Sequence, residues 1–372
     1  MKKRLVVVFC FAALALQATA QKKDRKAYKD QAATDFFKRS SGWIASDGGL
    51  TVHLSDNRTL WLMGDSHIDD YDPKTNTIPC LFQVRNAALL QPARSWDWMQ
   101  TKTLIGSGPG IKSLFKHTQD NNYWFWPGAG VQIKDTVYVY NSELSRTGPG
   151  TMGFAGTGKD MWAKMKFPEM EVVGYSVLPD FDNINFGCGF VRDDKSGYVY
   201  AFGGKLDPAI VGSNVYVARF PQADAGAPWE FWNGSDWVAD VKQVKSVATA
   251  AISPNVVRVK NKYVILSTAL SVACDQGKDI FASVGDSPIG PFTNAESIYT
   301  NDDTLQGHYP FFYTVVGHPQ FVNKKNELLV TYCINGYAPC LDPCDGKMGN
   351  RIDPNHYRLK AIRVPLELLG IK

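Results

Sequence analysis

Two aspartates near the start of the chain have the spacing that a pair of catalytic carboxylates requires. Asp47 precedes, and Asp65 follows, the dipeptide Asp56-Asn57, which is typical of a tight turn between two strands. If the chain turns there, residues whose numbers sum to about 113 face each other, so Asp47 and Asp65 lie nearly opposite. Directly paired residues have Cα atoms about 4.5–5.5 Å apart. The sequence therefore predicts two carboxylates held together at the open end of one hairpin.

Two carboxylates at this separation can perform acid–base chemistry on a sugar. They cannot both ionise easily, so the pKa of one of them should rise. The protonated group can donate its proton to a glycosidic oxygen, while the ionised partner activates water or attacks the sugar. A separation of about 5–5.5 Å would give retention of the anomeric configuration, and about 6.5–9.5 Å would give inversion. The sequence leaves both outcomes open.

Further polar and aromatic residues are expected around the same pocket. His67 and Asp69 follow Asp65 directly, and Glu143 lies at the corresponding end of a second hairpin. The other candidates for substrate contact are Trp43, Trp126, Asp182, Asp207 and His308. Each has an ordinary structural alternative, because loop aspartates often remain solvated or cap turns and histidines can hydrogen-bond backbone groups inside a fold.

The elements that must position these residues repeat along the chain as five hairpins. Their first strands are expected to begin at Trp43, Trp126, Gly187, Ser253 and His318, at intervals of 83, 61, 66 and 65 residues. Such a period, with about four strands in each unit, is typical of β-propeller blades. The longer first interval implies an insertion, which we place around residues 95–122. We therefore predict an all-β, five-bladed β-propeller, with a β-sandwich as the alternative.

The N-terminal residues are expected to lie outside this fold. Residues 1–20 combine a basic start, an apolar run and the small residues Ala18 and Ala20, a pattern typical of a secretory signal peptide. An N-terminal membrane anchor is the alternative, although the apolar run is short for a span. Residues 21–40 are polar and basic and are expected to form a flexible lead-in, and residues 41–372 a single propeller domain. This organisation predicts an exported protein, either periplasmic or extracellular.

Charge and cysteine content limit the possible partners and the compartment. Without the three basic residues of the signal, the chain has 37 Lys and Arg against 36 Asp and Glu and no long basic run, which argues against a nucleic-acid partner. Cys340 and Cys344, with Cys333 nearby, are spaced like a staple of one loop in an oxidising compartment, and Cys188 is expected to be a buried thiol. The pairing itself cannot be deduced from the sequence.

The opening hairpin resembles a known family. Ser46-Asp47-Gly48, followed by the segment Leu60-Trp61-Leu62-Met63-Gly64-Asp65-Ser66, resembles the first blade of a bacterial propeller family (DUF4185-like), some members of which are endo-D-arabinanases. The segments 232–237 and 287–292 look like its later blades, and the second is also similar to segments of arabinanase-like propellers more broadly. The resemblance implies that Asp47 and Asp65 are the catalytic pair and that the substrate is an arabinan-like furanoside. It also implies a calcium-like divalent cation near the axis, for which His318 is the candidate ligand.

These observations predict a secreted glycoside hydrolase that acts on a polysaccharide or oligosaccharide. We expect a monomer with no nucleic-acid partner, no membrane span and no required cofactor. Three alternatives remain: a non-catalytic propeller that binds a glycan, a polysaccharide lyase that uses His67 or a tyrosine as base, and a structural component of a surface complex. Other hydrolase classes lack support, because the chain contains no Gly-x-Ser-x-Gly motif and no zincin histidine pair.

Overall fold

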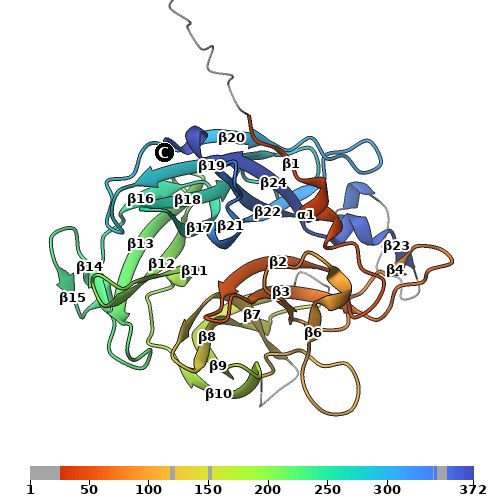
Figure 1. Cartoon of the computed structure of the whole chain (residues 1–372), viewed down its shortest axis with the longest axis horizontal. Helices are drawn as coiled ribbons and strands as arrows, with labels where there is room; N and C mark the ends of the chain where they lie inside the picture. The colour runs from red at the N-terminus through yellow and green to blue at the C-terminus, as the bar shows by residue number, and fades with distance from the viewer. Residues whose placement is uncertain (1–25, 118–121, 150–152, 338, 342–349) are drawn as a thin grey trace, which may run out of the picture.

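Five antiparallel sheets stand around one central axis (Figure 1), which confirms the predicted five-bladed β-propeller and rules out the β-sandwich. The computed structural model describes residues 26–117, 122–149, 153–337, 339–341 and 350–372. The predicted signal peptide, residues 1–20, lies outside this part of the chain.

Each blade begins with its innermost strand and continues outward. The first blade comprises β2 (Trp43–His53), β3 (Thr59–Ile68), β5 (Ala87–Gln91) and β6 (Lys102–Leu104). The second comprises β7 (Tyr123–Ile133), β8 (Thr136–Arg146), β9 (Phe154–Lys166) and β10 (Glu171–Val177). The third comprises β11 (Asn185–Asp193), β12 (Tyr198–Asp207), β13 (Gly212–Pro221), β14 (Glu230–Trp232) and β15 (Trp237–Val238), and β16 (Ala248–Ala250) also pairs with β13.

The last two blades complete the ring. The fourth comprises β17 (Ile252–Val259), β18 (Lys262–Thr268), β19 (Asp279–Gly285) and β20 (Glu296–Thr300). The fifth comprises β21 (Phe311–His318), β22 (Glu327–Asn335), β24 (Lys360–Pro365) and β1 (Tyr28–Lys29). A separate two-stranded sheet joins β4 (Ile78–Pro79) to β23 (Arg351–Ile352), so the loop after β3 is paired with the loop before β24.

Helical turns are short and lie between the strands. They are α1 (Gln31–Asp35), η1 (Trp98–Gln100), η2 (Val241–Gln243), η3 (Pro319–Phe321), η4 (Pro339–Leu341), η5 (Pro354–Tyr357) and η6 (Leu366–Leu369). In the part of the chain that the structure describes, none of these helices has the length and apolar composition needed to traverse a bilayer.

Four of the five predicted hairpins are confirmed, and the fifth is corrected. The pairs β2–β3, β7–β8, β11–β12 and β17–β18 are the first four, and the turns include Asn57 and Lys134 with positive φ, a conformation typical of tight hairpins. The fifth hairpin was predicted to begin at His318, but β21 ends there and η3 follows. Pro319 has no N–H for a strand ladder and suits the first position of a helical turn, which explains the end of the strand.

The hydrophobic core lies in the seams between neighbouring blades. Between the first and second blades, for example, Leu60 and Leu62 pack with Val137 and Val139. Similar clusters fill the other four seams. Because each sheet is covered by the next one, the fold places the innermost strands in a fixed ring around the axis.

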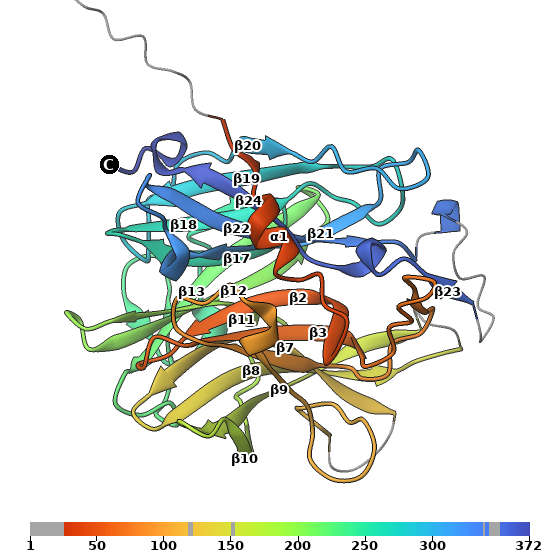
Figure 2. The same cartoon turned by 45° about the vertical axis from the view of Figure 1, so that its right-hand side comes forward.

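The N-terminal segment closes the ring, which corrects the expected flexible lead-in for residues 26–40. Strand β1 pairs with β24 at the outer edge of the fifth blade, and α1 lies beside it (Figure 2). Phe36 and Phe37 are buried between the fifth and first blades. The mostly polar composition of residues 21–40 gave no indication that these two phenylalanines would be buried or that a short edge strand would form. Residues 21–25 lie outside the described part of the chain.

The disulfide that the structure describes joins two different loops. Cys274, after β18, forms a disulfide with Cys340, after β22. Cys80 is also disulfide-bonded, while Cys333 is a buried free thiol and Cys188 a half-buried one. The predicted disulfide within the loop of Cys333, Cys340 and Cys344 is therefore wrong for Cys340, which pairs with Cys274, and for Cys333, which is a free thiol. Cys344 lies outside the described residues.

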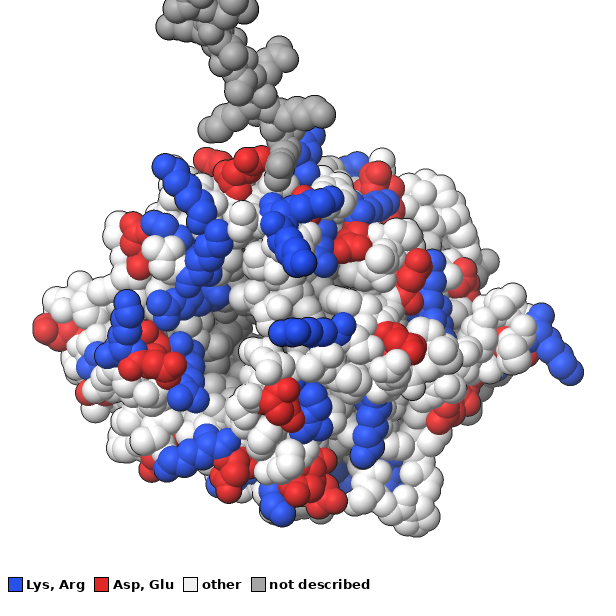
Figure 3. Space-filling view, in the orientation of Figure 1, with Lys and Arg blue, Asp and Glu red and all other residues white. Residues whose placement is uncertain are grey.

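The molecular surface carries both signs of charge. Figure 3 shows Lys and Arg interspersed with Asp and Glu on the face that it draws, and that face is hollowed near its centre, between the blades.

Candidate active site

The first hairpin brings Asp47 and Asp65 together, as predicted. Ser46 pairs with Ser66 across β2 and β3, and the register then shifts between Ser46 and Gly48. This bulge lies at Asp47, directly beside Asp65, and bulges commonly re-aim a side chain. The backbone N–H of Asp65 hydrogen-bonds the Asp47 carboxyl group, so the two residues are in direct contact.

Gly64 provides the space that the Asp47 carboxyl group occupies. A Cβ atom added at Gly64 would overlap Oδ1 of Asp47. A Cβ added at Gly48, whose φ is +94°, would lie 2.8 Å from the backbone nitrogen of Gly64. Both glycines are therefore required for the close approach of the two strands at the carboxylate pair.

Asp65 is buried and is held by two donors from neighbouring segments. Nη1 of Arg85 lies 3.3 Å from Oδ2, and the indole Nε1 of Trp126 lies 3.2 Å from Oδ1. Burial, followed by the negative charge of Asp47, raises the pKa of Asp65 to about 7. The Arg85 charge and the two hydrogen bonds oppose this rise because they favour the ionised carboxylate.

Asp47 is surrounded by hydroxyl groups instead of cations. The hydroxyl of Tyr313 donates to Oδ2 of Asp47 at 3.0 Å, and Tyr357 also hydrogen-bonds this carboxyl group. Burial is the main cause that raises the pKa of Asp47, and these hydrogen bonds reduce the rise. Since only Asp65 faces a guanidinium, Asp65 is the group that ionises first and Asp47 the group that keeps the proton.

Aromatic side chains line the partly exposed surroundings of the pair. The ring of Trp126 packs edge-on against Phe154 with centroids 4.9 Å apart, and Tyr313 stacks on Phe311 at 4.5 Å. The guanidinium carbon of Arg85 lies 4.2 Å from the ring centroid of Trp124. Flat apolar faces beside hydrogen-bonding groups suit a ligand that has both, such as a sugar ring.

His67 lies in a second layer next to the pair. It is fully buried, its Nδ1 lies 2.7 Å from Oδ2 of Asp70, and its Nε2 lies 2.9 Å from the hydroxyl of Tyr337. The Tyr337 ring packs edge-on against Tyr357 with centroids 5.0 Å apart. His67 is thus near the carboxylates, as predicted, but its buried position leaves Tyr337 between it and a ligand.

The family of this chain is shown by its sequence. The family described as "Domain of unknown function (DUF5005)" matches residues 30–358. The chain belongs to the DUF5005 family. A search of curated proteins gives no significant match to it.

A search of solved structures finds proteins similar to this DUF5005 protein. A "putative hydrolase" from Bacteroides ovatus ATCC 8483 is 18% identical, with a TM-score of 0.72 over 91% of this chain and 90% of that one. An alpha-L-arabinofuranosidase from Lactobacillus brevis is 11% identical, with a TM-score of 0.48 over 89% and 93%. An endo-arabinase from Bacteroides thetaiotaomicron VPI-5482 is 11% identical, with a TM-score of 0.45 over 88% and 97%. At 18% identity, the likeness to the Bacteroides ovatus structure shows the propeller fold alone.

Two residues predicted to contact substrate have structural contacts in the DUF5005 propeller instead. Trp43 is fully buried, packs against Phe37, and donates from Nε1 to Oγ of Ser46 at 3.0 Å. Asp69 is exposed and accepts a hydrogen bond from the backbone N–H of Gly42. The prediction for Trp43 is corrected, because a fully buried ring cannot stack on a sugar; an aromatic residue at the start of a strand can equally well pack between two blades. The role of Asp69 as a substrate contact stays a prediction.

Glu143 occupies the corresponding end of the second blade but is fully engaged. It is buried on β8, where His117 Nε2 lies 2.9 Å from Oε2 and the Thr157 hydroxyl donates to Oε1 at 2.7 Å. No contact between Glu143 and Asp47 or Asp65 is present among the described residues. A role for Glu143 in the same pocket stays a prediction, which rests on its position at the same end of the blades as the pair.

The remaining predicted contacts lie on the loops of the third and fourth blades. Asp182 is exposed and pairs with Lys205 at 3.1 Å. Asp207 ends β12 and accepts from Nδ2 of Asn214 at 2.9 Å. His308 pairs through Nδ1 with Asp275 at 2.6 Å. The structure does not bring these three residues to the carboxylate pair, so they stay predictions as distal substrate contacts.

His318 does not fit the predicted metal site. Both ring nitrogens are used, since Thr51 Oγ1 lies 2.9 Å from Nδ1 and Thr331 Oγ1 lies 2.8 Å from Nε2. The ring is fully buried against Trp61, and burial lowers the pKa of His318 to about 3. Within the described residues, no group of three His, Cys, Asp or Glu side chains is placed to hold an ion. The sequence resemblance could not reveal these two hydroxyl partners.

Four residues that complete the site of this DUF5005 protein were not predicted from its sequence. Arg85 lies in the loop before β5, Tyr313 on β21, Tyr337 after β22 and Tyr357 in η5. Arg85 follows a Gln-Val dipeptide with no distinctive motif, and the tyrosines lie more than 240 residues from Asp65. Only the closure of the ring brings the fifth blade beside the first.

Proposed function

We propose that this protein is a secreted glycoside hydrolase that cleaves a polysaccharide with Asp47 and Asp65. The observation that supports it is a pair of adjacent carboxyl groups in different environments, one facing Arg85 and the other facing tyrosine hydroxyls. Pairs of titratable groups whose surroundings separate their protonation states are typical of acid–base catalysis.

In this proposal the two residues divide the proton transfers. Asp47 donates its proton to the glycosidic oxygen as the bond from that oxygen to the anomeric carbon breaks. Asp65, ionised beside Arg85, either takes a proton from the attacking water or attacks the anomeric carbon itself. The configuration of the released sugar, measured by NMR, distinguishes these two routes.

The substrate class is proposed from the site and from the opening hairpin. Trp126 and Tyr313 offer partly exposed aromatic surfaces on either side of the pair. The sequence resemblance to endo-D-arabinanase-containing propellers favours an arabinan-like furanoside. The name of the Bacteroides ovatus structure, a "putative hydrolase", is compatible with this reaction class.

We also propose that the protein is exported and acts as a monomer outside the cytoplasm. The disulfide between Cys274 and Cys340, together with the disulfide-bonded Cys80, supports an oxidising compartment. The monomeric state rests on the sequence expectation alone.

The test is reducing-end release from a panel of arabinans, other furanosides and pyranoside polysaccharides. Asp47→Asn and Asp65→Asn should each lower kcat by about 10²–10⁴-fold, because a positioned acid or base contributes that much. Asp194→Asn is the matched control, since Asp194 is exposed and pairs only with Arg192 in the turn between β11 and β12. Circular dichroism should show that all three variants are folded.

The outcomes separate the proposed functions. Cutting that survives both site substitutions would place the catalytic residues elsewhere. A polymer that binds the parent protein without being cut would instead support a non-catalytic glycan-binding propeller.

A polysaccharide lyase is the second candidate, and one contact favours it. The 2.9 Å approach of His67 Nε2 to the Tyr337 hydroxyl is suited to a base that removes the C5 proton of a uronate, which the adjacent carboxylate makes acidic, as the C4–O bond breaks and the departing oxygen takes up a proton. Such a reaction leaves a C4=C5 double bond, so the products absorb ultraviolet light, whereas hydrolysis products do not.

A further inference from the structure

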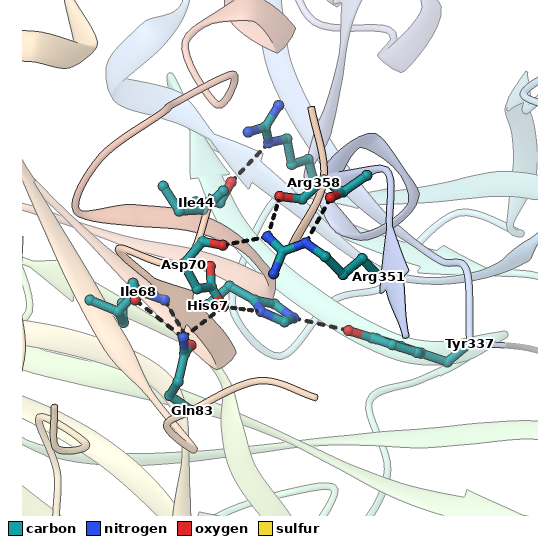
Figure 4. A network of polar contacts seen from close by, with 9 residues as sticks. Ile44, His67, Ile68, Asp70, Gln83, Tyr337, Arg351 and Arg358 are labelled. Carbon is teal, nitrogen blue, oxygen red and sulfur yellow. Dashed lines mark hydrogen bonds and ion pairs between the residues drawn. The ribbon is translucent and has the colours of Figure 1, made fainter. Parts of the chain in front are cut away.

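Three side chains form a line between the first and fifth blades: Asp70, His67 and Tyr337 (Figure 4). Oδ2 of Asp70 lies 2.7 Å from Nδ1 of His67, and Nε2 of His67 lies 2.9 Å from the Tyr337 hydroxyl. We call these residues the Asp70–His67–Tyr337 chain. Its members come from the loop after β3, from β3 itself and from the loop after β22, so the chain connects the first and fifth blades.

The far end of this chain is held firmly. Gln83 donates from Nε2 to Oδ2 of Asp70 at 2.6 Å, and Arg351 donates from Nη2 to the Asp70 carbonyl at 2.9 Å. His67 has no exposed surface, and its ring lies edge-on to Tyr357 with centroids 6.2 Å apart. A buried imidazole with both nitrogens bonded keeps one ring orientation.

The contacts also set the direction of the hydrogen bonds. We assign the His67 hydrogen to Nδ1, because this nitrogen faces the carboxyl oxygen Oδ2 of Asp70, an acceptor. In this tautomer Nε2 carries a lone pair, and the Tyr337 hydroxyl donates to it. The proton of Tyr337 is thereby directed at His67, and the phenolic oxygen retains its lone pairs for another donor.

The Tyr337 oxygen is close to the proposed chemistry. Tyr337 is partly exposed, its ring packs on Tyr357, and Tyr357 hydrogen-bonds Asp47. The backbone N–H of Tyr337 donates to Oδ1 of Asn335 at 2.8 Å, and Nδ2 of Asn335 donates at 3.2 Å to the Tyr313 hydroxyl that bonds Asp47. These contacts place Tyr337 in the layer next to the carboxylate pair.

We propose that Tyr337 binds substrate by accepting a hydrogen bond from a sugar hydroxyl, and that His67 and Asp70 are positioning residues that orient it. This inference rests on the proposed glycan-cleaving function. A sugar carboxylate placed against the Tyr337 oxygen would find no donor there, because the hydroxyl hydrogen is directed at His67. The chain therefore selects an uncharged sugar ring at this position over a uronate.

The test compares Tyr337→Phe, His67→Gln and the double variant with the parent protein. Tyr337→Phe keeps the ring on Tyr357 and removes only the hydroxyl, and Tyr28→Phe is the matched control because its hydroxyl bonds Glu327 at the outer edge of the fifth blade. Each protein is measured for kcat and KM on the polymer that the panel identifies. Retention in gels containing linear arabinan or polygalacturonate measures binding without turnover, and Tm checks the fold.

Tyr337→Phe should lower kcat/KM and weaken retention on the neutral polymer about tenfold, the effect of one hydrogen bond to substrate. His67→Gln should lower kcat/KM and retention by a smaller factor. In the Tyr337→Phe background, the same substitution should change these two quantities by less than about twofold, because His67 acts through Tyr337. If His67→Gln does not fold, the comparison of Tyr337→Phe with the Tyr28→Phe control still tests whether Tyr337 binds substrate.

Several results would overturn the inference. One is a Tyr337→Phe variant with parental kcat/KM and retention, even if Asp47→Asn is inactive, since the hydrolase proposal would then stand without Tyr337. Another is tighter binding of polygalacturonate than of arabinan. If the parent protein binds arabinan without cutting any polymer, the hydrolase proposal fails. The role of Tyr337 is then tested only by the retention of Tyr337→Phe in arabinan gels. If the parent neither cuts nor binds any polymer, both proposals fail.

Discussion

Arg85 is the residue that makes the two carboxyl groups of the site unequal. Asp47 and Asp65 share a hairpin, a buried position and each other's charge, and both have raised pKa values. Only Asp65 faces a guanidinium, at 3.3 Å, and that guanidinium is stacked on Trp124 and so is held in place. The arginine therefore fixes which carboxyl group is ionised when the pair holds a single proton.

This role predicts a pH dependence for Arg85→Gln. Asp65 works in its ionised form, so kcat/KM should rise with pH through its pKa of about 7. Arg85 lowers this pKa, so its removal raises the pKa and should move the acid limb of the profile upward by about one pH unit. The measurement is kcat/KM from pH 4 to 9 on the polymer that the parent protein cuts.

The control for this measurement is Arg219→Gln. Arg219 also stacks on aromatic rings and pairs with a carboxylate, Glu230, but it lies on the third blade. Its profile should match that of the parent protein. An Arg85→Gln profile with an unmoved acid limb, or one moved to lower pH, would contradict the assignment of Asp65 as the ionised partner.

At the residue scale, the sequence predicted what a single hairpin contains and little beyond it. Asp47 and Asp65 could be paired because a recognisable turn lies between them, and the register of β2 and β3 agrees. The predicted roles of Trp43 in substrate contact and of His318 in metal binding were wrong, because the burial of a side chain depends on the opposing blade, which no local pattern describes. Arg85 and the tyrosines approach from segments whose positions only the closed ring determines.

At the scale of elements, the β2–β3 hairpin is shaped by its bulge and its glycines. The register shifts twice between Ser46 and Leu50, and this places Asp47 over Gly64 on the facing strand. A regular hairpin would leave no room for a carboxyl group between its strands. The close approach at Gly64 is therefore part of the site.

Gly64→Ala should consequently inactivate the protein without unfolding it. The new methyl group would overlap Oδ1 of Asp47, so the carboxyl group must move. A displacement of about 1 Å can lower kcat about 10²-fold, and overpacking costs about 1–3 kcal/mol of unfolding free energy. Both are measured with the purified variant, as kcat on the identified polymer and as ΔG from urea unfolding.

Gly174→Ala in β10 is the matched control, because nothing lies within 4 Å of its added Cβ. It should keep parental activity and stability. Parental activity in Gly64→Ala would mean that the position of Asp47 does not limit the reaction.

Elements were predictable where a turn separates two strands of similar type. Four hairpins and the Trp232–Trp237 tip were located from such turns. The fifth hairpin was displaced because Pro319 and the residues after it look like the first strands of other blades, although they form η3. Local composition cannot distinguish these two conformations when the strand before them, Phe311–His318, is equally apolar.

At the scale of the whole molecule, the ring depends on how its two ends meet. The fifth blade takes three strands from the C-terminal part of the chain and its outermost strand, β1, from the N-terminal part. Arg363 on β24 bonds Asp30 through Nε at 2.6 Å, which adds an ion pair to this closure. The same closure brings Tyr313, Tyr337 and Tyr357 beside the aspartates of the first blade, so stability and site geometry share one seam.

The seam gives a prediction for Phe37→Ala. Phe37 is fully buried between the fifth and first blades, with ring centroids 5.3 Å from Trp61 and 6.1 Å from Trp43. Its truncation leaves a cavity and should lower the free energy of unfolding by about 3–5 kcal/mol, measured by urea denaturation. Met99→Ala is the control, since Met99 is 75% exposed and should change this free energy by less than about 0.5 kcal/mol. An unchanged unfolding midpoint in Phe37→Ala would show that the N-terminal segment rests on a ring that is already stable without it.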